Sequence, residues 1–219
     1  MNARDIRVLI VDDQELLRRG MRMVLDAEPD VSVVGEAATG YEAVEAVERL
    51  SPDVVLMDVR MPGLDGIEAT RRVVRTSPQS RVIILTTFDL DDYAFGGLRA
   101  GASGFLIKST PPNELVNAIR SVAAGDALIS PRVTRSMLDL FVAQLPRGAA
   151  TRPSGIDSLT ERERDVFLAI AQGLTNHEIA ARFTVSESTV KTHVGRVLQK
   201  LDLRDRVQAV IAAYEWGFV

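Results

Sequence analysis

Several absences in the 219-residue chain limit its possible functions before any motif is considered. The sequence contains no cysteine, which excludes disulfide bonds and thiolate metal sites. It contains two histidines, and without a third such ligand we expect no histidine metal site. The sequence has no run of about 18 apolar residues, so it predicts no membrane-spanning helix. The N-terminal apolar run is interrupted by Asp12 and Asp13, unlike a signal peptide. We therefore expect a cytoplasmic protein without a membrane partner.

The charge balance does not point to a nucleic-acid partner. Charged residues make up 26% of the chain, and the formal net charge is −4. Because no overall basic excess is present, a DNA-binding surface would have to arise from local geometry. Hydrophobic residues make up 46% of the chain, which is enough for one large domain or two small ones.

Apolar, strand-forming runs alternate with helical patterns over residues 6 to 125. Between the runs, apolar residues recur three and four positions apart, as on one face of a helix. Such alternation predicts a parallel sheet covered by helices on both faces. Five strands favour an α/β, flavodoxin-like fold with strand order 2-1-3-4-5. The expected strands are residues 6–11, 31–36, 54–57, 82–86 and 104–107.

A different, helical regime begins near Pro131. Apolar positions predict a connector helix over 132–145, and the composition of 146–155 is that of a mobile linker. Two capping-box patterns mark helix starts beyond the linker, at Thr160 with Glu163 and at Thr175 with Glu178. The sequence thus predicts an α/β domain over 1–128, a connector over 129–155 and a small all-α helix-turn-helix domain over 156–219.

Polar side chains follow the expected strands of the first domain. They are Asp12 and Asp13 after the first strand, Asp58 after the third, Thr86 at the end of the fourth and Lys108 after the fifth. Because the carboxyl ends of parallel strands meet at one edge of the sheet, we expect these side chains to lie together. Three neighbouring carboxylates need a cation, and oxygen ligands favour Mg²⁺. With a hydroxyl and an ammonium group, they predict a phosphoryl-transfer site with Asp58 as the nucleophile.

Each of these residues also has an ordinary explanation. Asp12 and Asp13 can cap the following helix, and Asp58 can begin a turn. Lys108 can be a solvated lysine, and Thr86 an ordinary strand residue. Such separate explanations do not predict that all of them stand at matching strand ends.

Residues 6 to about 125 resemble the receiver domain of two-component response regulators. The resemblance rests on VLIVDDQ, VLMDVRMPGLDG, the threonine of ILTTF, and AGASGFLIK. It implies that Asp58 accepts a phosphoryl group from the phosphohistidine of a sensor histidine kinase. It also implies that Thr86 and Lys108 contact the phosphoryl oxygens, and that Thr86 and Phe105 act as switch residues.

The same resemblance implies a magnesium site formed by Asp12, Asp13, Asp58 and the backbone carbonyl of Arg60. Arg60 departs from what is usual in the family, because it places a large cation beside the phosphoacceptor. We hypothesise that Arg60 alters the lifetime of the phosphorylated state by obstructing or repositioning the attacking water.

Residues 175 to 201 have the pattern of a helix, a short turn and a second helix. On the second helix, apolar residues share one face: Val190, Val194, Val197, Leu198 and Leu201. The other face carries polar and basic candidates for DNA contact: Ser188, Lys191, Thr192, Arg196 and Gln199. Such a helix can enter a major groove. The pattern alone also fits an amphipathic helix with a solvated face.

Residues 156 to 219 resemble the LuxR-type helix-turn-helix domain over LTERERDVFLAIAQGLTNHEIAARFTVSESTVKTHVGRVLQKL. This resemblance implies that Glu187 to Lys200 is the recognition helix and that residues 205–216 mediate dimerisation. Lys191, Thr192 and Arg196 become the principal candidate DNA contacts. Two positions depart from the usual pattern. Gly195 stands where relatives often carry a side chain that reaches DNA, and His177 replaces a frequent lysine.

Together these features predict a transcriptional regulator and not an enzyme. Phosphorylation of Asp58 is expected to change dimerisation and DNA binding. The expected partners are a sensor histidine kinase, double-stranded promoter DNA, a second copy of the chain on activation, and RNA polymerase. An aspartyl-nucleophile phosphatase would carry a second aspartate where Arg60 stands. A regulator acting without phosphorylation is the remaining alternative, and its acidic site would be expected to be incomplete.

Overall fold

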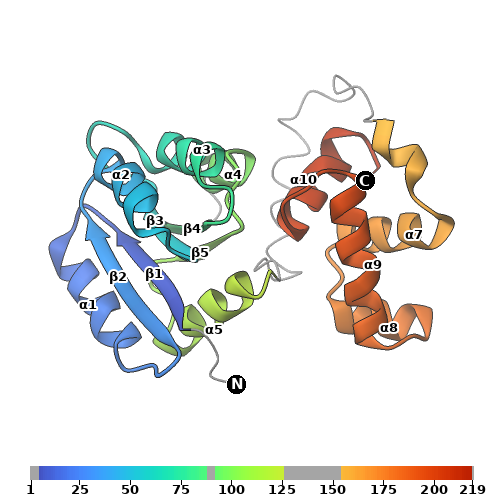
Figure 1. Cartoon of the computed structure of the whole chain (residues 1–219), viewed down its shortest axis with the longest axis horizontal. Coiled ribbons are helices and arrows are strands. Elements are labelled where there is room, and N and C mark those ends of the chain that lie inside the picture. The colour runs from blue at the N-terminus through green and yellow to red at the C-terminus, as the bar shows by residue number, and fades with distance from the viewer. Residues whose placement is uncertain (1–4, 88–91, 126–153, 219) are drawn as a thin grey trace. The chain divides into compact units, whose positions relative to one another are not determined.

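Residues 6 to 125 fold into a five-stranded parallel sheet with helices on both sides (Figure 1). This computed structural model describes residues 5–87, 92–125 and 154–218 of the chain. The strands are hydrogen-bonded in the order β2-β1-β3-β4-β5, which confirms the predicted order. Their bounds are β1 (Ile6–Val11), β2 (Val31–Ala37), β3 (Val54–Asp58), β4 (Arg81–Thr86) and β5 (Gly104–Ile107). Each bound lies within one residue of its predicted position.

The helices cover the two faces of this sheet. α1 and α5 lie on one side, and α2 and α3 lie on the other (Figure 1). Apolar residues of β1, β3 and β4 form a buried core with α5 and the end of α1. Because both faces are covered, every residue of β3 is buried, which explains its continuous apolar sequence. The helix bounds are α1 (Glu15–Leu25), α2 (Gly40–Leu50), α3 (Gly66–Thr76), α4 (Asp92–Arg99) and α5 (Pro112–Ala123).

The chain divides into two compact units, Met1–Leu128 and Ile129–Val219. The predicted connector helix over 132–145, and the predicted linker as far as residue 153, lie outside the described residues. The second unit has a hydrophobic core of its own, built on residues such as Phe167, Ile170 and Val197. Each unit therefore buries its own apolar residues.

The described part of the second unit is helical, as the sequence predicts. Its elements are η1 (Ser154–Ser158), α7 (Glu161–Ala171), α8 (Asn176–Phe183), α9 (Glu187–Lys200) and α10 (Arg206–Glu215). Both predicted capping boxes are present at the starts of α7 and α8. The Ser186 side chain caps α9, whose bounds match the predicted recognition helix. The turn before α9 passes through Thr184, which adopts a left-handed conformation with φ of 55°.

Aromatic side chains near the end of the chain pack into this second core. The rings of Trp216 and Phe218 lie 6.1 and 5.7 Å from the Phe167 ring, measured between centroids. Aromatic pairs at these distances stabilise a core beyond the area that they bury. Trp216 is also the single tryptophan of the chain, so its fluorescence reports on this unit.

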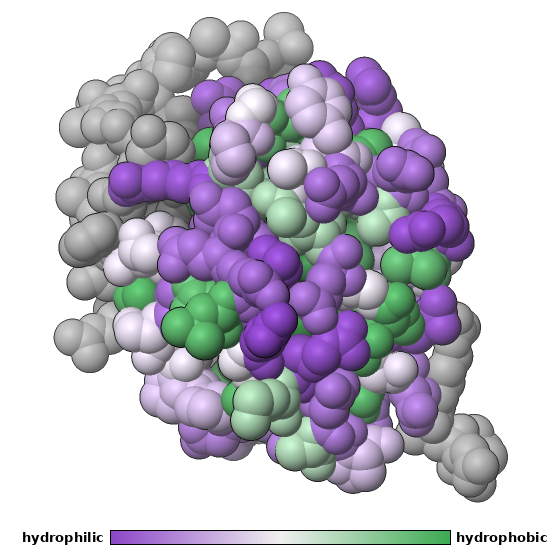
Figure 2. Space-filling view, turned by 90° about the vertical axis from the view of Figure 1, so that its left-hand side faces the viewer, coloured by the Kyte–Doolittle hydropathy of each residue, from purple (hydrophilic) through white to green (hydrophobic). Residues whose placement is uncertain are grey.

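Figure 2 shows the surface over the side of the first unit that carries α1, β2 and α2. Hydrophilic residues predominate there, and hydrophobic residues form small separate patches. The large hydrophobic side chains most exposed among the described residues are Leu16, Met23 and Tyr41. None of the described helices has the length and apolarity that a bilayer crossing needs.

An ion pair between the exposed Lys200 and the buried Glu163 joins the end of α9 to the start of α7. The Nζ of Lys200 lies 2.6 Å from a carboxylate oxygen of Glu163, which is almost fully buried. The hydrogen bonds from Lys200 and from the Thr160 backbone N–H lower the pKa of Glu163 from 4.5 to about 2. Because the folded-state pKa is depressed, this stabilisation is present above pH 4.5 and is lost as the pH falls toward about 2.

We therefore expect Glu163→Gln to lower the free energy of unfolding at pH 7 by about 1 to 3 kcal/mol. The difference from wild type should become smaller at pH 3. Denaturant unfolding followed by Trp216 fluorescence measures this directly. A difference that stays constant between pH 7 and pH 3 would show that the ionised carboxylate is not its source.

Candidate phosphoryl-transfer site and nucleic-acid interface

The sheet brings the predicted polar residues to one edge. Asp58 ends β3 opposite Leu85, and Thr86 ends β4 opposite Ile107. The backbone N–H of Lys108 donates to the carbonyl oxygen of Thr86 at 2.6 Å, which joins the ends of β4 and β5. A hollow of about 310 Å³ opens at this edge. It is lined by Asp13, Gln14, Asp58, Val59, Arg60, Thr86, Thr87 and Lys108.

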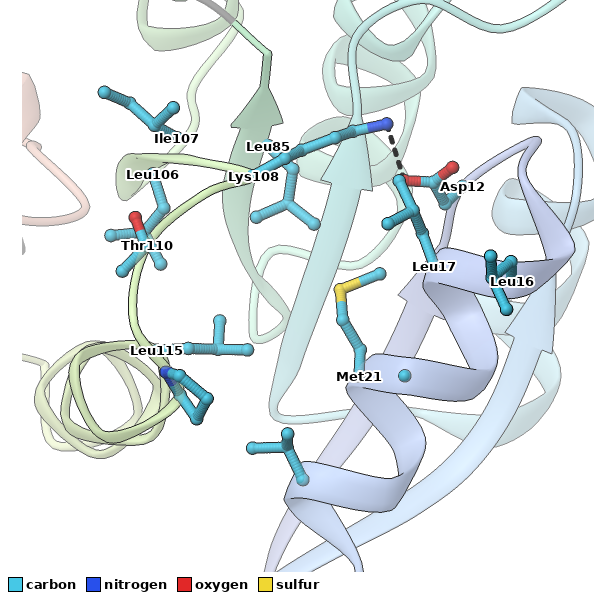
Figure 3. A pocket seen from close by; sticks show the side chains of 13 residues that line it. Asp12, Leu16, Leu17, Met21, Leu85, Leu106, Ile107, Lys108, Thr110 and Leu115 are labelled. Carbon is cyan, nitrogen blue, oxygen red and sulfur yellow. Dashed lines mark ion pairs between the residues drawn. The ribbon is translucent and has the colours of Figure 1, made fainter.

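The side chain of Lys108 lies between two buried carboxylates. Its Nζ is 2.7 Å from Asp12 Oδ2 and 3.1 Å from Asp58 Oδ2. Figure 3 shows the pair formed with Asp12. Asp12 is 0% exposed and Asp58 is 4% exposed, so water does not solvate either charge well. An ammonium group at this distance offsets part of the cost of burying them.

Opposing effects act on the pKa of the Asp58 carboxyl group. Burial raises this pKa above its usual value, and the neighbouring Asp12 charge raises it further. The charge and hydrogen bond of Lys108 lower it, as does the backbone N–H of Arg60. Burial has the largest effect, so the pKa of Asp58 lies above its usual value despite the nearby ammonium group.

The acidic residues at this edge fit a hard divalent cation. Ligand oxygens of Asp12, Asp13 and Asp58 all lie within 4.8 Å of one another. Asp12 Oδ2 is buried and makes no aligned hydrogen bond with any described group, although the Lys108 nitrogen is close. Oxygen donors of this kind suit Mg²⁺, which typically takes one or two carboxylates and retains several waters. Among the described residues, no other group of three acidic or histidine side chains comes as close together.

Two glycines shape the turn that follows Asp58. A Cβ atom on Gly66 would stand 1.9 Å from the carbonyl oxygen of Asp58, which no side chain can do. The N–H of Gly66 donates to the carbonyl oxygen of Val59 at 2.9 Å, which closes the turn. Gly63 has a φ of 81°, a conformation that favours glycine. Both glycines of the motif are therefore needed by the backbone beside Asp58.

The predicted switch residues occupy different places around the site. Thr86 lines the hollow and is almost fully buried, with 6% of its surface exposed. Phe105 is also buried, but it lies in β5 and does not line the hollow. Arg60 lines the hollow with an exposed side chain. The structure thus brings together the predicted phosphoryl-contacting residues. Phe105 lies within β5, before the strand end that reaches the hollow.

In the second unit, α9 presents two distinct faces. Val190, Val197 and Leu201 are buried in the core, and Val194 and Leu198 pack against it. The predicted DNA-contacting side chains are all exposed: Ser188, Lys191, Thr192, Arg196 and Gln199. Apart from the nearby backbone of α9 itself, no described heavy atom lies within 4 Å of where a Cβ on Gly195 would stand. The polar face of α9 is therefore accessible, with a gap in side chains at Gly195.

Comparison with known protein families assigns both units. The family described as "Response regulator receiver domain" matches residues 8–120. The family described as "Bacterial regulatory proteins, luxR family" matches residues 157–213. The chain is a two-component response regulator with an N-terminal receiver domain and a C-terminal LuxR-type DNA-binding domain. A receiver domain implies a histidine kinase partner, and a LuxR-type domain binds DNA.

Relatives match this response regulator over nearly its whole length. It is 43% identical over 220 residues to the uncharacterized transcriptional regulatory protein YxjL of Bacillus subtilis, with 100% of both chains covered. It is 39% identical to the transcriptional regulatory protein LiaR of the same organism, over 95% of this chain and 97% of LiaR. Among solved structures, the response regulator ChrA of a heme-sensing two-component system is 33% identical. That match has a TM-score of 0.53 and covers 98% of this chain and 99% of ChrA.

The receiver domain also contains an apolar groove that the sequence pattern did not indicate. It lies between α1 and the β5–α5 segment, below the Lys108–Asp12 pair (Figure 3). Its volume is about 200 Å³, and Leu17, Met21 and Leu115 are among the apolar residues that line it. Residues from four separate elements form this groove, so no local pattern could have revealed it.

A histidine contacts the start of α9, the predicted recognition helix. His177 Nδ1 lies 2.8 Å from a carboxylate oxygen of Glu187, and both side chains are exposed. The contact joins the first turns of α8 and α9. His193 is half-buried, and its Nδ1 has no hydrogen-bond partner among the described residues. Neither histidine belongs to a described cluster of three possible metal ligands.

Two glycine-to-alanine substitutions should distinguish the steric clash with the Asp58 carbonyl from the general effect of alanine on helix stability. Gly66→Ala places a methyl group against the Asp58 carbonyl, so we expect the receiver domain to lose at least about 1 to 3 kcal/mol of stability. Gly20→Ala is the matched control, because no heavy atom beyond the nearby backbone of α1 lies within 4 Å of the new Cβ. It should leave stability unchanged or raise it by up to about 1 kcal/mol. Differential scanning calorimetry of the full chain compares the two, and equal effects would contradict the steric explanation.

Proposed function

We propose that phosphorylation of Asp58 switches this response regulator, changing its dimerisation and its binding to promoter DNA. The observation that carries the proposal is the position of Asp58. Its buried carboxylate ends a central strand beside Lys108, with Asp12 and Asp13 close enough to share a cation. A carboxylate in these surroundings can act as a nucleophile toward a phosphoryl group.

In this proposal a carboxylate oxygen of Asp58 attacks the phosphorus of a phosphohistidine on a sensor histidine kinase. The bond to the histidine nitrogen breaks, and an aspartyl phosphate forms on Asp58. Lys108 lies within 3.1 Å of Asp58, so its ammonium group can neutralise phosphoryl oxygens. The Thr86 hydroxyl can donate to another phosphoryl oxygen from the same hollow.

The metal ligands proposed for this step are Asp12, Asp13, Asp58 and the backbone carbonyl of Arg60. Mg²⁺ supplies positive charge that neutralises the transferring phosphoryl oxygens when it is bound. The chain's own residues supply the ligand set, in which ligand oxygens of Asp12, Asp13 and Asp58 lie within 4.8 Å of one another. The same positive charge would oppose the effect of burial and lower the pKa of Asp58.

Thr86 and Phe105 are the proposed switch residues. Both are buried on the adjacent strands β4 and β5, where Thr86 pairs with Ile107 and Phe105 pairs with Ile84. Phosphorylation adds charge at the end of β4, where Thr86 lies. We propose that the surface formed by about 86–125 repacks and either dimerises or releases the DNA-binding domain through the connector.

For DNA binding we propose that α9 enters the major groove with its exposed polar face. Arg196 and Lys191 can contact bases or phosphates, and Thr192 and Gln199 can reach base edges. Ser188 lies one turn before Thr192. The hydroxyl of Thr192 donates to the backbone carbonyl oxygen of Ser188 at 3.0 Å. With the last helix mediating dimerisation, the two recognition helices would meet half-sites about one helical turn apart. Bound in this way, the dimer would contact RNA polymerase.

The proposed domain limits are 1–128 for the receiver, 129–155 for the connector and 156–219 for the DNA-binding domain.

The alternative to phosphorylation-dependent regulation is a regulator that responds to a ligand or protein without phosphorylation. The site is complete, with its acidic residues, Thr86 and Lys108 all present. This favours regulation by phosphorylation over the alternative. The two proposals differ in whether a phosphate mimic changes the protein.

The decisive measurement uses beryllofluoride with Mg²⁺ as a mimic of phosphate on Asp58. We expect the wild-type chain to shift toward a dimer in gel filtration and to bind promoter fragments at least about tenfold more tightly. Asp58→Ala should lose both responses. Arg196→Ala is the matched variant in the other domain, and it should keep the dimer shift but bind DNA about 1 to 3 kcal/mol more weakly. A wild-type chain that responds in neither assay would contradict phosphorylation-dependent regulation.

Arg60 provides a separate proposal about the duration of the signal. Its exposed side chain lines the hollow beside Asp58, where attacking water must approach an aspartyl phosphate. We expect Arg60→Asn to change the dephosphorylation half-life by at least about threefold, or about 0.6 kcal/mol in the barrier. The control is Arg71→Asn, which removes an exposed arginine that pairs with Glu68 on α3. An unchanged half-life in Arg60→Asn, measured by decay of radiolabelled phosphate, would reject the role.

A further inference from the structure

An arginine of α1 reaches back to the strand end that carries the acidic site. The Nη1 of Arg18 donates to the backbone carbonyl oxygen of Asp12 at 2.7 Å. Asp12 is fully buried, and the Arg18 side chain is only 15% exposed. Because a charged donor makes a stronger hydrogen bond than a neutral one, this contact holds the carbonyl firmly.

The orientation of this carbonyl affects Asp13 as well as Asp12. The carbonyl of Asp12 and the N–H of Asp13 belong to one planar peptide group. The other hydrogen bonds of Asp12 involve its own N–H and its side chain, neither of which belongs to this peptide group. Its N–H donates to the carbonyl oxygen of Ala37 at 3.2 Å, and its Oδ1 accepts from the N–H of Gln14 at 2.9 Å. Arg18 therefore fixes the direction in which the chain leaves Asp12 and presents Asp13.

Arg18 is itself held in place by Glu36 at the exposed edge strand β2. The Nε of Arg18 lies 3.4 Å from Glu36 Oε2, and the Nε of Arg22 lies 2.5 Å from Glu36 Oε1. The hydrogen bond from Arg22 is the main cause of a lowered pKa for Glu36, and Arg18 adds to it. Glu36 is therefore ionised at neutral pH and can hold both arginines.

We propose that Arg18, held by Glu36, is a positioning residue for the divalent cation at Asp12, Asp13 and Asp58. The proposal rests on the metal site of the proposed function and extends it to a residue that does not touch the metal. Mg²⁺ requires nearly octahedral ligands at about 2.0 to 2.1 Å, so a rotated Asp12–Asp13 peptide weakens binding. Groups that orient metal ligands typically contribute 10- to 100-fold to metal affinity.

The test measures Mn²⁺ binding to the unphosphorylated full chain by electron paramagnetic resonance of the free ion. Mn²⁺ serves as the probe because it accepts the same oxygen ligands. We expect Arg18→Met to raise the dissociation constant about tenfold. Arg18→Lys should fall between this variant and wild type, because lysine keeps one charged donor but lacks the fork that also reaches Glu36. Glu36→Gln should weaken binding in the same direction and by less.

The matched control is Arg19→Met, one position along the same helix. Arg19 pairs with Glu15 on the surface, where both side chains are well exposed. The control should bind Mn²⁺ as wild type does. An Arg18→Met variant with wild-type affinity, or an equal loss in Arg19→Met, would overturn the positioning role. If Arg18→Met does not fold, as judged by circular dichroism, wild-type affinity in both Arg18→Lys and Glu36→Gln overturns it equally.

A second readout distinguishes positioning from general destabilisation. The Mg²⁺ concentration for half-maximal phosphorylation by acetyl phosphate should rise about tenfold in Arg18→Met. The final level of phosphorylated Asp58 at saturating Mg²⁺ should match wild type. A reduced final level with an unchanged Mg²⁺ requirement overturns the proposal. A wild-type chain that binds no Mn²⁺ would instead reject the metal site itself, and with it both proposals.

Discussion

The ammonium group of Lys108 lies between two buried carboxylates, and the rest of the receiver site depends on that contact. Asp12 and Asp58 come from neighbouring strands β1 and β3, whereas Lys108 follows β5 at the edge of the sheet. Without a nearby cation, two carboxylates this buried would repel each other and favour protonation. The ammonium offsets part of that cost, and the third carboxylate, Asp13, still leaves an excess of negative charge for a divalent ion.

The two domains of the response regulator use charge in opposite ways. The receiver buries Asp12 and Asp58 at the end of a sheet, where low solvation strengthens their interactions. The DNA-binding domain leaves Lys191 and Arg196 exposed on α9 and buries only apolar residues on the opposite face. A buried charge can respond to one added phosphate, whereas exposed charges can meet the extended surface of DNA.

Both proposed sites are supported by residues that do not themselves contact phosphate, metal or DNA. In the receiver, Glu36 and Arg18 lie behind Asp12, and Gly66 allows the turn to close against the Asp58 carbonyl. In the DNA-binding domain, Lys200 joins the end of α9, the proposed recognition helix, to Glu163 at the start of α7. Such contacts fix the direction of functional side chains, which matters most where a metal or a groove imposes strict geometry.

The sequence by itself determined the strand order, the helix starts and the members of the acidic site. Local periodicity and capping patterns specify these elements, and parallel strands bring residues such as Asp58 and Lys108 to one edge. Only the tertiary structure decided that Arg18 binds the Asp12 carbonyl, that Glu163 pairs with Lys200, and that a groove opens beside α1. These contacts depend on how side chains from separate elements pack together, and the local sequence pattern carries no record of that packing.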